Sequence, residues 1–393
     1  MPDGHPSIDK SIEILGRLIA HDTTSALSNI PLIEEVRAYL AEFGIPCRLT
    51  YDASDQKANL SATIGPDKPG GIVLSGHTDV VPTNGQVWTT DPFKLTERDA
   101  KLFGRGTSDM KGFVACVLAA VPMFHAADLA MPVHLAFSFD EEVGCVGVRR
   151  LIADLVERET KPAACIVGEP TGMAVVNAHK GKIAHEVTIT GRAAHSSLTP
   201  NGVNAITFGA RLVVQLEAMA QAWRRDGPCD EGYDVPFTTA QAGLISGGKA
   251  INIVPDECTL SLEIRHLPEM RGPTLMAALI DHANTVLLPE MRAIDPSTDI
   301  AFAQIMQYPG LNTDAGAASL ALAKGLAGSK DHVKVAFGTE AGLFQQAGID
   351  TVVIGPGRID QAHTPDEFIA VDQLAACNAF LARLCQRLTL GPL

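Results

Sequence analysis

Apolar residues along much of the chain form short continuous runs that alternate with stretches of helical periodicity. A run that is apolar at every position is typical of a central strand covered on both faces. Four such runs are found at residues 72–74, 133–139, 165–167 and 351–354. Helical spacing of apolar residues is found at 29–43, 110–121, 147–157 and 371–388. This pattern predicts an α/β fold with a largely parallel sheet that is covered by helices.

The middle of the chain follows a different pattern. Residues 186–190 and 258–265 alternate between apolar and polar positions, and helical spacing is found at 203–220 and 274–287. One buried face and one wet face are typical of antiparallel strands. We therefore expect a smaller α+β domain at residues 183–298, which interrupts a larger domain made of residues 1–182 and 299–393.

Length and composition agree with this division. A chain of 393 residues is too long for one ordinary hydrophobic core, so two domains are expected. The apolar fraction of 46% and the charged fraction of 19% are normal for globular proteins. The net charge of −14 argues against nucleic acid or an anionic membrane as a partner, because both attract basic surfaces.

The cysteines and the N-terminus bear on the compartment. The eight cysteines are scattered and never form a Cys-x-x-Cys pair, which favours buried thiols over disulfides or metal ligands. Residues 1–10 show no basic region followed by an apolar stretch, so no signal peptide is visible, and no apolar run reaches the length of a membrane span. We expect a cytoplasmic protein.

Acidic residues and a histidine directly follow three of the predicted buried strands. His77 follows the first, the pair Glu141 and Glu142 follows the second, and Glu169 follows the third. Sites in open α/β sheets are built at this edge. Asp79, two residues after His77, could accept the second ring N–H of the imidazole and so fix its tautomer.

Each of these residues also has an ordinary explanation. His77 and His363 could be surface histidines, Asp109 could cap the helix that follows it, and Glu141–Glu142 could form a solvated turn. Several carboxylates at one sheet edge would, however, repel one another unless a cation neutralised them. Two histidines and three carboxylates suit zinc, and cobalt or manganese would also fit. Five protein ligands can hold two metals about 3.5–4 Å apart if one carboxylate bridges them.

Several segments of the chain resemble the M20 family of metal-dependent amidases and peptidases, in the same order and over essentially the whole length. Within that family the resemblance is to the acetylornithine deacetylases. The segments that carry it are SGHTDVVP at 75–82, GRGTSDMKG at 104–112, DEEVG at 140–144 and GEPT at 168–171, supported by 88–93, 178–181, 252–255, 338–342 and 362–368.

The resemblance implies how the metal-binding residues are divided. Asp109 would bridge two metals, His77 and Glu169 would complete one site, and Glu142 and His363 would complete the other. Glu141 would be the general acid/base, a separation from Glu142 that spacing alone does not give. Water shared by the two metals would ionise near neutral pH and attack an amide carbonyl, and Glu141 would pass the proton to the departing amine.

The resemblance also implies residues outside the metal centre. His195 matches a family histidine that stabilises the oxyanion from the smaller, dimerisation domain of a partner subunit, which implies a homodimer; by itself it could lie on an exposed turn. Arg265 could bind the substrate carboxylate or form a surface salt bridge. Asn252 and Gly357 match pocket positions, and Glu340 could receive a cationic side chain.

The implied reaction is removal of the acetyl group from N2-acetyl-L-ornithine, which gives L-ornithine and acetate in arginine biosynthesis. Succinyl-diaminopimelate desuccinylase, or a broader N-acyl-amino-acid amidohydrolase or carboxypeptidase, is the alternative within the family. The stretch 338–342 fits the deacetylase better. A one-metal enzyme and an inactive binding protein are further alternatives, although every expected ligand position is filled.

Overall fold

The computed structural model describes residues 6–158 and 161–392, and the chain divides into two compact units. The larger unit contains the described residues of 1–178, 311–334 and 339–393. The smaller unit contains residues 179–310 and 335–338. The expected limit at 298 was too early: strand β12 (Asp299–Tyr308) belongs to the smaller unit because its backbone pairs along its length with β9 (Gly181–Thr190).

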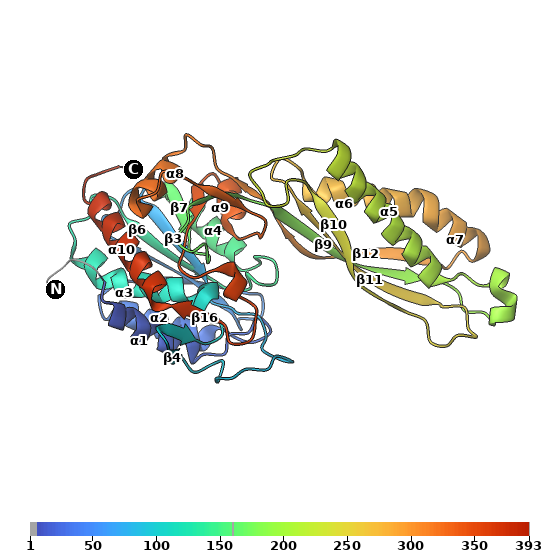
Figure 1. The fold of residues 1–393 in the computed structure, drawn as a ribbon, viewed down its shortest axis with the longest axis horizontal. Coiled ribbons are helices and arrows are strands. Elements are labelled where there is room, and N and C mark those ends of the chain that lie inside the picture. Colours follow the sequence, from blue (N-terminus) through green and yellow to red (C-terminus); the bar gives the residue numbers. More distant parts are fainter. Residues whose placement is uncertain (1–5, 159–160, 393) are drawn as a thin grey trace. The chain divides into compact units, whose positions relative to one another are not determined.

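A mixed sheet forms the centre of the larger unit (Figure 1). Its strands follow the order β1-β2-β6-β3-β7-β15-β8-β13, with β14 paired to β8. The central strands β6, β3, β7 and β15 are parallel to one another, whereas β1, β2 and β8 pair antiparallel. The strands are β1 (Cys47–Tyr51), β2 (Ala58–Ile64), β3 (Ile72–His77), β6 (Val133–Ser138), β7 (Ala164–Val167), β8 (Val176–His179), β13 (Leu311–Asn312), β14 (Val333–Val335) and β15 (Asp350–Val353).

The four parallel strands are the four continuous apolar runs of the sequence, so the predicted α/β fold with a largely parallel sheet is confirmed. Alternate residues of these strands, such as Ile72 and Leu74, pack together with residues of five helices in one hydrophobic core. Helices α4 (Val148–Glu157) and α9 (Ala341–Gln346) contact the same sheet outside that core. The five helices are α1 (Ile8–Ile19), α2 (Ile30–Ala41), α3 (Gly112–Ala126), α8 (Ala318–Ala327) and α10 (Val371–Leu388).

Helix α3 is the most apolar of these elements. The stretch Thr107–Ala126, which contains it, is long and apolar enough to cross a membrane by composition alone, and it is mostly buried inside the fold. It packs against α1 and α10, which makes it the central helix of the larger unit (Figure 1). A small antiparallel sheet lies near its N-terminal end and consists of β4 (Thr96–Arg98), β5 (Lys101–Phe103) and β16 (Phe368–Ala370).

The smaller unit is a four-stranded antiparallel sheet with helices on one face. Its strand order is β10-β11-β9-β12. Along β11, Cys258, Leu260, Leu262 and Ile264 are buried against the helices, as the alternating pattern predicts. The remaining elements are β10 (Thr239–Gly247), β11 (Glu257–His266), α5 (Ala205–Asp226), α6 (Gly272–His282), α7 (Leu288–Ile294) and the short helical turns η2 (Ser196–Asn201) and η3 (Ala283–Leu287).

Candidate metal centre

Three neighbouring parallel strands bring the acidic residues and one histidine together. His77 is the last residue of β3, Glu141 and Glu142 follow β6, and Glu169 follows β7. Because β3 lies between β6 and β7 and runs parallel to both, the carboxyl ends of all three strands meet at one edge. The backbone N–H of Thr78 donates to the carbonyl of Ser138, which extends this register past His77.

Asp109 and His363 reach the same place from two connecting segments. Asp109 lies in the short turn η1 (Thr107–Lys111) that leads into α3, and its peptide bond to Met110 is cis. His363 follows the turn η4 (Ile359–Gln361) and adopts a left-handed backbone conformation with a φ of 61°. A left-handed histidine is uncommon and is held only where the surrounding structure fixes it.

The carboxylate of Asp109 lies between the two histidines. Its Oδ1 is 3.0 Å from Nε2 of His77, and its Oδ2 is 3.2 Å from Nε2 of His363. Glu142 Oε2 lies 3.1 Å from His363 Nε2, and Glu169 Oε1 lies 3.9 Å from His77 Nε2. The structure therefore brings all five predicted ligands together, with one oxygen of Asp109 toward each histidine.

The donor atoms suit divalent cations. Ligand atoms of His77, Glu141 and Glu169 lie within 4.8 Å of one another, and so do those of His77, Asp109 and Glu142. Glu169 Oε1 is buried without a hydrogen-bond partner, which is costly for a carboxylate unless a cation compensates it. Oxygen and imidazole donors in this number match zinc and the related transition metals. The residues present fit two metal ions.

The pKa values of the buried carboxyls support the same conclusion. Burial raises the pKa of Glu141 to about 8 and that of Glu142 to about 7, and it raises the pKa of Glu169 well above its usual range. Negative neighbours, Asp109 among them, push in the same direction. Crowded carboxyls that hold their protons this firmly are expected where a cation is the natural counter-charge.

The pKa values of the two histidines are also raised, because their surroundings are acidic. Although burial lowers it, the pKa of His77 is raised well above its ordinary value by the hydrogen bond to Asp109 and the charge of Glu169. Hydrogen bonds to Asp109 and Glu142 raise the pKa of His363 to about 10. A metal ion would take the place of these protons, because a metal-bound imidazole must be neutral.

Glu141 lies in the same cluster as the ligands. One of its oxygens, Oε1, accepts a hydrogen bond from the thiol of Cys145 at 3.2 Å, and its other near neighbours are His77 and Glu169. Both adjacent glutamates are therefore within reach of the centre, and the side-chain positions alone do not divide them into ligand and base. Cys145 was not anticipated from the sequence.

Asp79 does not act as expected. Nδ1 of His77 contacts the backbone carbonyl of Asp79 at 2.9 Å, whereas the Asp79 carboxylate is 3.7 Å away. That carboxylate instead accepts the backbone N–H groups of Glu141 and Glu142 and the hydroxyl of Ser25. The chain turns after β3 so that the carbonyl faces the ring. The carbonyl thus fixes the tautomer of His77, and the carboxylate fixes the glutamate pair.

A buried ion pair between Arg105 and Glu367, next to the turn that carries Asp109, was also not predicted from the sequence. The carboxylate of Glu367 accepts the backbone N–H groups of Ser108 at 2.9 Å and Asp109 at 3.1 Å, and it pairs with Arg105 at 2.6 Å. Arg105 also donates to Gln86, whose amide donates to the carbonyl of His363. A signal was present in the sequence, because Arg105 and Glu367 are opposite charges that flank Asp109 and His363 in two of the quoted segments.

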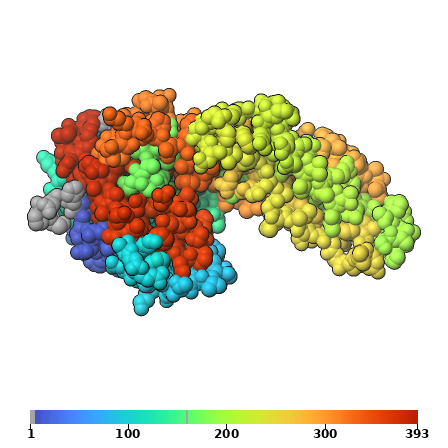
Figure 2. Space-filling view, in the orientation of Figure 1, coloured from blue at the N-terminus to red at the C-terminus, as the bar shows by residue number. Residues whose placement is uncertain are grey.

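Hydrogen bonds next to this ion pair join two surface segments that are distant in sequence. Thr89 donates through its backbone N–H and its hydroxyl to the carboxylate of Asp366. Figure 2 shows the segment that follows residue 84 and the segment before β16 side by side on the surface of the larger unit. The loop that carries His363 is thereby tied to the loop that carries Gln86.

Glu340 does not offer a carboxylate to a substrate. It is 0% exposed, and its two oxygens accept hydrogen bonds from the hydroxyls of Ser75 and Ser138 on the adjacent strands β3 and β6. The expected role as a receptor for a cationic side chain is therefore wrong, because the strands cover the group. Gly357 has a φ of 86°, and a Cβ there would approach the hydroxyl of Ser108 to 2.4 Å, so its place is against the turn that holds Asp109.

The remaining predicted residues lie in the smaller unit. His195 is exposed at the start of η2, where its ring accepts the backbone N–H of Ser197, and its backbone pairs with Ile253. Asn252 is next to that pairing and accepts the N–H of Ser196 through its carbonyl. Arg265 lies on the open face of β11 and pairs with Glu263, which is the salt bridge that the sequence left as an alternative.

A cluster of three carboxylates and two histidines at the carboxyl edge of a parallel sheet defines an α/β protein with a two-metal type of site. The comparisons with known proteins narrow this class. The model of Peptidase family M20/M25/M40 matches residues 73–387. Acetylornithine deacetylase from Myxococcus xanthus is 35% identical over 374 residues, which cover 94% of this chain and 95% of that protein.

Solved structures agree in fold. The M20 family metallo-carboxypeptidase Sso-CP2 from Sulfolobus solfataricus has a TM-score of 0.78 at 18% identity, covering 97% of this chain and all of that one. The Bacillus subtilis YXEP protein, described as a dinuclear metal binding peptidase of the M20 family, has a TM-score of 0.66 at 16% identity over 98% of each chain. The chain belongs to peptidase family M20/M25/M40 and is a metal-dependent amidohydrolase.

Proposed function

We propose that this enzyme removes the acetyl group from N2-acetyl-L-ornithine and releases L-ornithine and acetate, a step of arginine biosynthesis. The observation that carries the proposal is the similarity, over nearly the full length of both chains, to a relative named acetylornithine deacetylase. The free thiol state of all eight cysteines fits a reducing cytoplasm as the compartment.

The proposed cofactors are two divalent metal ions, with Zn²⁺ the preferred species and Co²⁺ or Mn²⁺ as substitutes. Asp109 would contribute to both metal sites, since its oxygens face different histidines. His77 and Glu169 would hold one ion with it, and Glu142 and His363 would hold the other. Bound ions supply Lewis acidity toward the amide carbonyl and lower the pKa of the attacking water.

Glu141 is the proposed general base and acid. It takes the proton from the water that attacks the carbonyl carbon and delivers it to the amide nitrogen, so that the C–N bond breaks to leave a neutral amine. Burial raises its pKa to about 8, and a cation nearby would lower that value toward neutrality, where one group can both accept and donate a proton. The Asp79 carboxylate orients Glu141 through the backbone.

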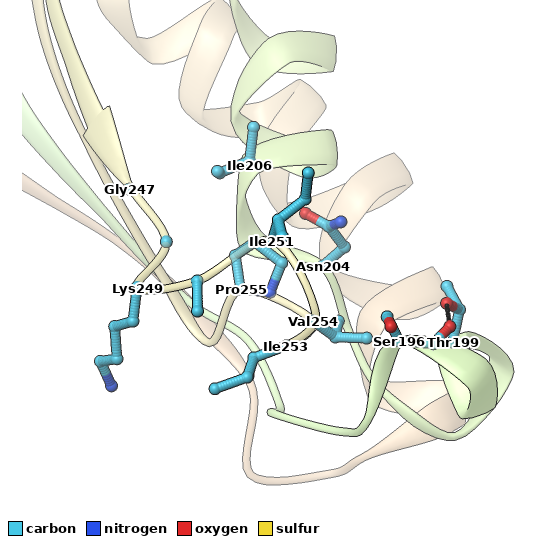
Figure 3. A pocket seen from close by; sticks show the side chains of 12 residues that line it. Ser196, Thr199, Asn204, Ile206, Gly247, Lys249, Ile251, Ile253, Val254 and Pro255 are labelled. Carbon is cyan, nitrogen blue, oxygen red and sulfur yellow. Dashed lines mark hydrogen bonds between the residues drawn. The ribbon is translucent and has the colours of Figure 1, made fainter.

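The proposed assembly is a homodimer formed through the smaller unit. Strand β10 is an edge strand, and its Leu244 and Ile245 are exposed. Next to it a hollow of about 560 Å³ is lined by Ile206, Ile251 and Pro255, and Ile251 is fully exposed (Figure 3). Exposed apolar side chains beside an open strand edge favour pairing with a second copy. His195 of the partner subunit would then stabilise the oxyanion.

The test is a comparison of kcat/KM between N-acetylornithine, N-succinyl-diaminopimelate and other N-acetylated amino acids, with the metal-loaded enzyme. The proposal expects N-acetylornithine to have the highest value. A preference for the succinylated substrate would replace it with the desuccinylase, and equal rates on many N-acyl amino acids would replace it with a broad amidohydrolase.

A further inference from the structure

A hollow of about 400 Å³ opens beside Glu142 in the larger unit. Its walls are the loop of residues 22–27 after α1, residues 81–84 after β3, and Glu142 with Val143. Since Glu142 is a proposed metal ligand, a group in this hollow is next to the bond that is hydrolysed. The volume exceeds what an acetyl methyl group needs and falls within the usual range of small-molecule pockets.

The loop that forms one wall is fixed to the metal centre. The hydroxyl of Ser25 donates to Oδ2 of Asp79 at 2.7 Å, and the hydroxyl of Thr23 donates to the carbonyl of Thr78 at 2.6 Å. The backbone of Ser25 donates to Val80. These bonds attach the loop to the segment that follows His77, so the hollow is formed before any ligand binds.

The lining of the hollow is largely apolar and contains one carboxylate besides that of Glu142, namely Asp22. Leu27 and Val143 are exposed within it, and Val81 and Pro82 add aliphatic surface. The only charged side chains among its lining residues are Glu142 and Asp22. Asp22 accepts from the backbone N–H and the hydroxyl of Thr24 through Oδ1. Burial lowers the pKa of the nearby Lys111, and the charge of Asp22 opposes that shift, but the Lys111 ammonium donates to the backbone carbonyls of Leu18 and His21 and forms no described ion pair with Asp22.

We infer that this hollow receives the side chain of the N-acylated amino acid and that Asp22 pairs with a cation at its end. An aliphatic stem that ends in an ammonium group matches apolar walls with a carboxylate. An acidic group would meet Asp22 and Glu142 with no cation among the lining residues, which disfavours a succinyl carboxylate here. The inference rests on the proposed function and names the residue that would select ornithine.

The first experiment changes Asp22 to Asn in the metal-loaded enzyme. Asparagine keeps an oxygen for the contacts from Thr24 and loses only the charge. The ratio of kcat/KM for N-acetylornithine to that for N-acetylnorvaline, which lacks the amine, should fall about ten- to hundredfold, mostly through KM. Asp295→Asn is the control: Asp295 makes the same two contacts with Ser297, also pairs with Arg192 at 3.4 Å, and lies in the smaller unit, so its change should leave the ratio unchanged.

A second variant tests the hollow without touching a charge. Ala26 is exposed on its wall, and Ala26→Trp should fill it. The value of kcat/KM for N-acetylornithine should then fall at least tenfold more than that for N-acetylalanine, whose side chain ends at Cβ. A larger loss for longer acyl groups on one amino acid would instead place the acyl group in the hollow and overturn the inference.

The two proposals fail in different ways. A wild-type enzyme that does not hydrolyse N-acetylornithine contradicts the proposed function, and N-acetyllysine against N-acetylnorleucine then tests Asp22 by the same ratio. An unchanged ratio in Asp22→Asn, in an enzyme that does hydrolyse its cationic substrate, overturns the role of Asp22 and leaves the proposed function intact.

Discussion

At the scale of single residues, the carboxylate of Asp109 is the group that both histidines of the centre contact. Each oxygen of Asp109 faces a different histidine, and hydrogen bonds from His363 and His77 hold the pKa of Asp109 well below its usual range despite burial. Its neighbours Glu141, Glu142 and Glu169 instead have raised pKa values. Asp109 is therefore the carboxylate of the group that releases its proton most readily before any cation binds.

The two adjacent glutamates should respond differently to the same change. Glu141→Gln should keep about two metals per chain while kcat falls by roughly 10²–10⁴, the usual contribution of a general acid/base. Glu142→Gln is the matched variant and should lose metal from the site shared with His363. Elemental analysis with steady-state kinetics measures both. Loss of metal in Glu141→Gln with retention in Glu142→Gln would reverse the assignment.

The metal-free enzyme should lose stability as pH rises. Glu141 and Glu142 have folded pKa values of about 8 and about 7 against an ordinary value of 4.5, so the folded chain keeps protons that the unfolded chain releases. The stability that these two carboxyls contribute to the metal-free form is thus fully present below about pH 4.5 and is lost as the pH rises from there through about 7 and 8. The raised pKa values of His77 and His363 act in the same direction.

Metal ions bind the deprotonated ligands, so the stabilisation that they provide should grow over the same interval. Urea midpoints of the metal-free and metal-loaded enzyme at about pH 5, 6.5 and 8 measure this difference. A difference that stays constant, or shrinks as pH rises, would mean that the cluster does not titrate as a metal site.

The gathering of the ligand side chains could be predicted from the sequence, but the contacts around them could not. His77 ends one buried parallel strand and Glu169 follows another, and the sheet order places the ends of these two strands side by side. The carboxylate of Asp79 and that of Glu340 were assigned wrongly, because their partners depend on the path of the turn after β3 and on two serines of adjacent strands. No pattern along the chain records such contacts.

At the scale of elements, the turn that carries Asp109 is fixed by hydrogen bonds to the buried carboxylate of Glu367. Glu367 is 1% exposed, accepts the N–H groups of Ser108 and Asp109, and pairs with Arg105. A buried ion pair adds little stability by itself, but removing one partner leaves the other charge uncompensated. We infer from these contacts that Glu367 orients the carboxylate of Asp109 by fixing the backbone of η1.

Glu367→Gln should therefore weaken the metal centre more than it weakens the fold. The amide retains an oxygen for the backbone N–H groups and loses the charge that holds Arg105, so metal affinity should fall about 10- to 100-fold, as for other outer partners of metal ligands. Competition with a chelator measures the affinity, and the d–d spectrum of the Co²⁺ form reports the geometry. Arg211, whose ion pair with Glu290 is exposed, provides the control Arg211→Gln.

The two readouts separate orientation from general destabilisation. An unchanged spectrum and affinity with a lowered urea midpoint would assign Glu367 to the fold alone.

Long, strongly patterned elements such as β3, β6 and α10 could be predicted from the sequence. Two- and three-residue strands such as β13 and β16 could not, because so short a stretch carries no periodicity and forms only where a neighbour supplies its hydrogen bonds.

At the scale of the whole molecule, residues 6–158 and 161–392 form two hydrophobic cores, one in each unit. The change from continuous to alternating apolar residues marked the smaller unit in the sequence. The position of its end was less visible, because β12 carries several exposed residues and joins the unit through backbone pairing with β9. Such pairing leaves no record in the order of apolar residues.

The proposed homodimer predicts that two inactive variants can restore activity when their chains form one dimer. If His195 of the partner subunit completes each site, then His195→Ala and Glu141→Gln inactivate different halves of the same site. In a hybrid dimer of the two variants, one site keeps Glu141 from one chain and His195 from the other. Half of randomly mixed dimers are hybrids with one complete site of two, so about a quarter of the wild-type activity should return.

Each variant alone must be nearly inactive and dimeric by light scattering for this result to count, and mixing should follow a brief dissociation so that chains exchange. The matched control mixes Glu141→Gln with Glu142→Gln, whose changes lie in the same half-site and cannot complement each other. Activity that stays at the sum of the parent variants, in a sample shown to contain hybrids, would place His195 in its own chain's site or outside catalysis. Restored activity requires a complete site built from two chains, which no contact within one chain can provide.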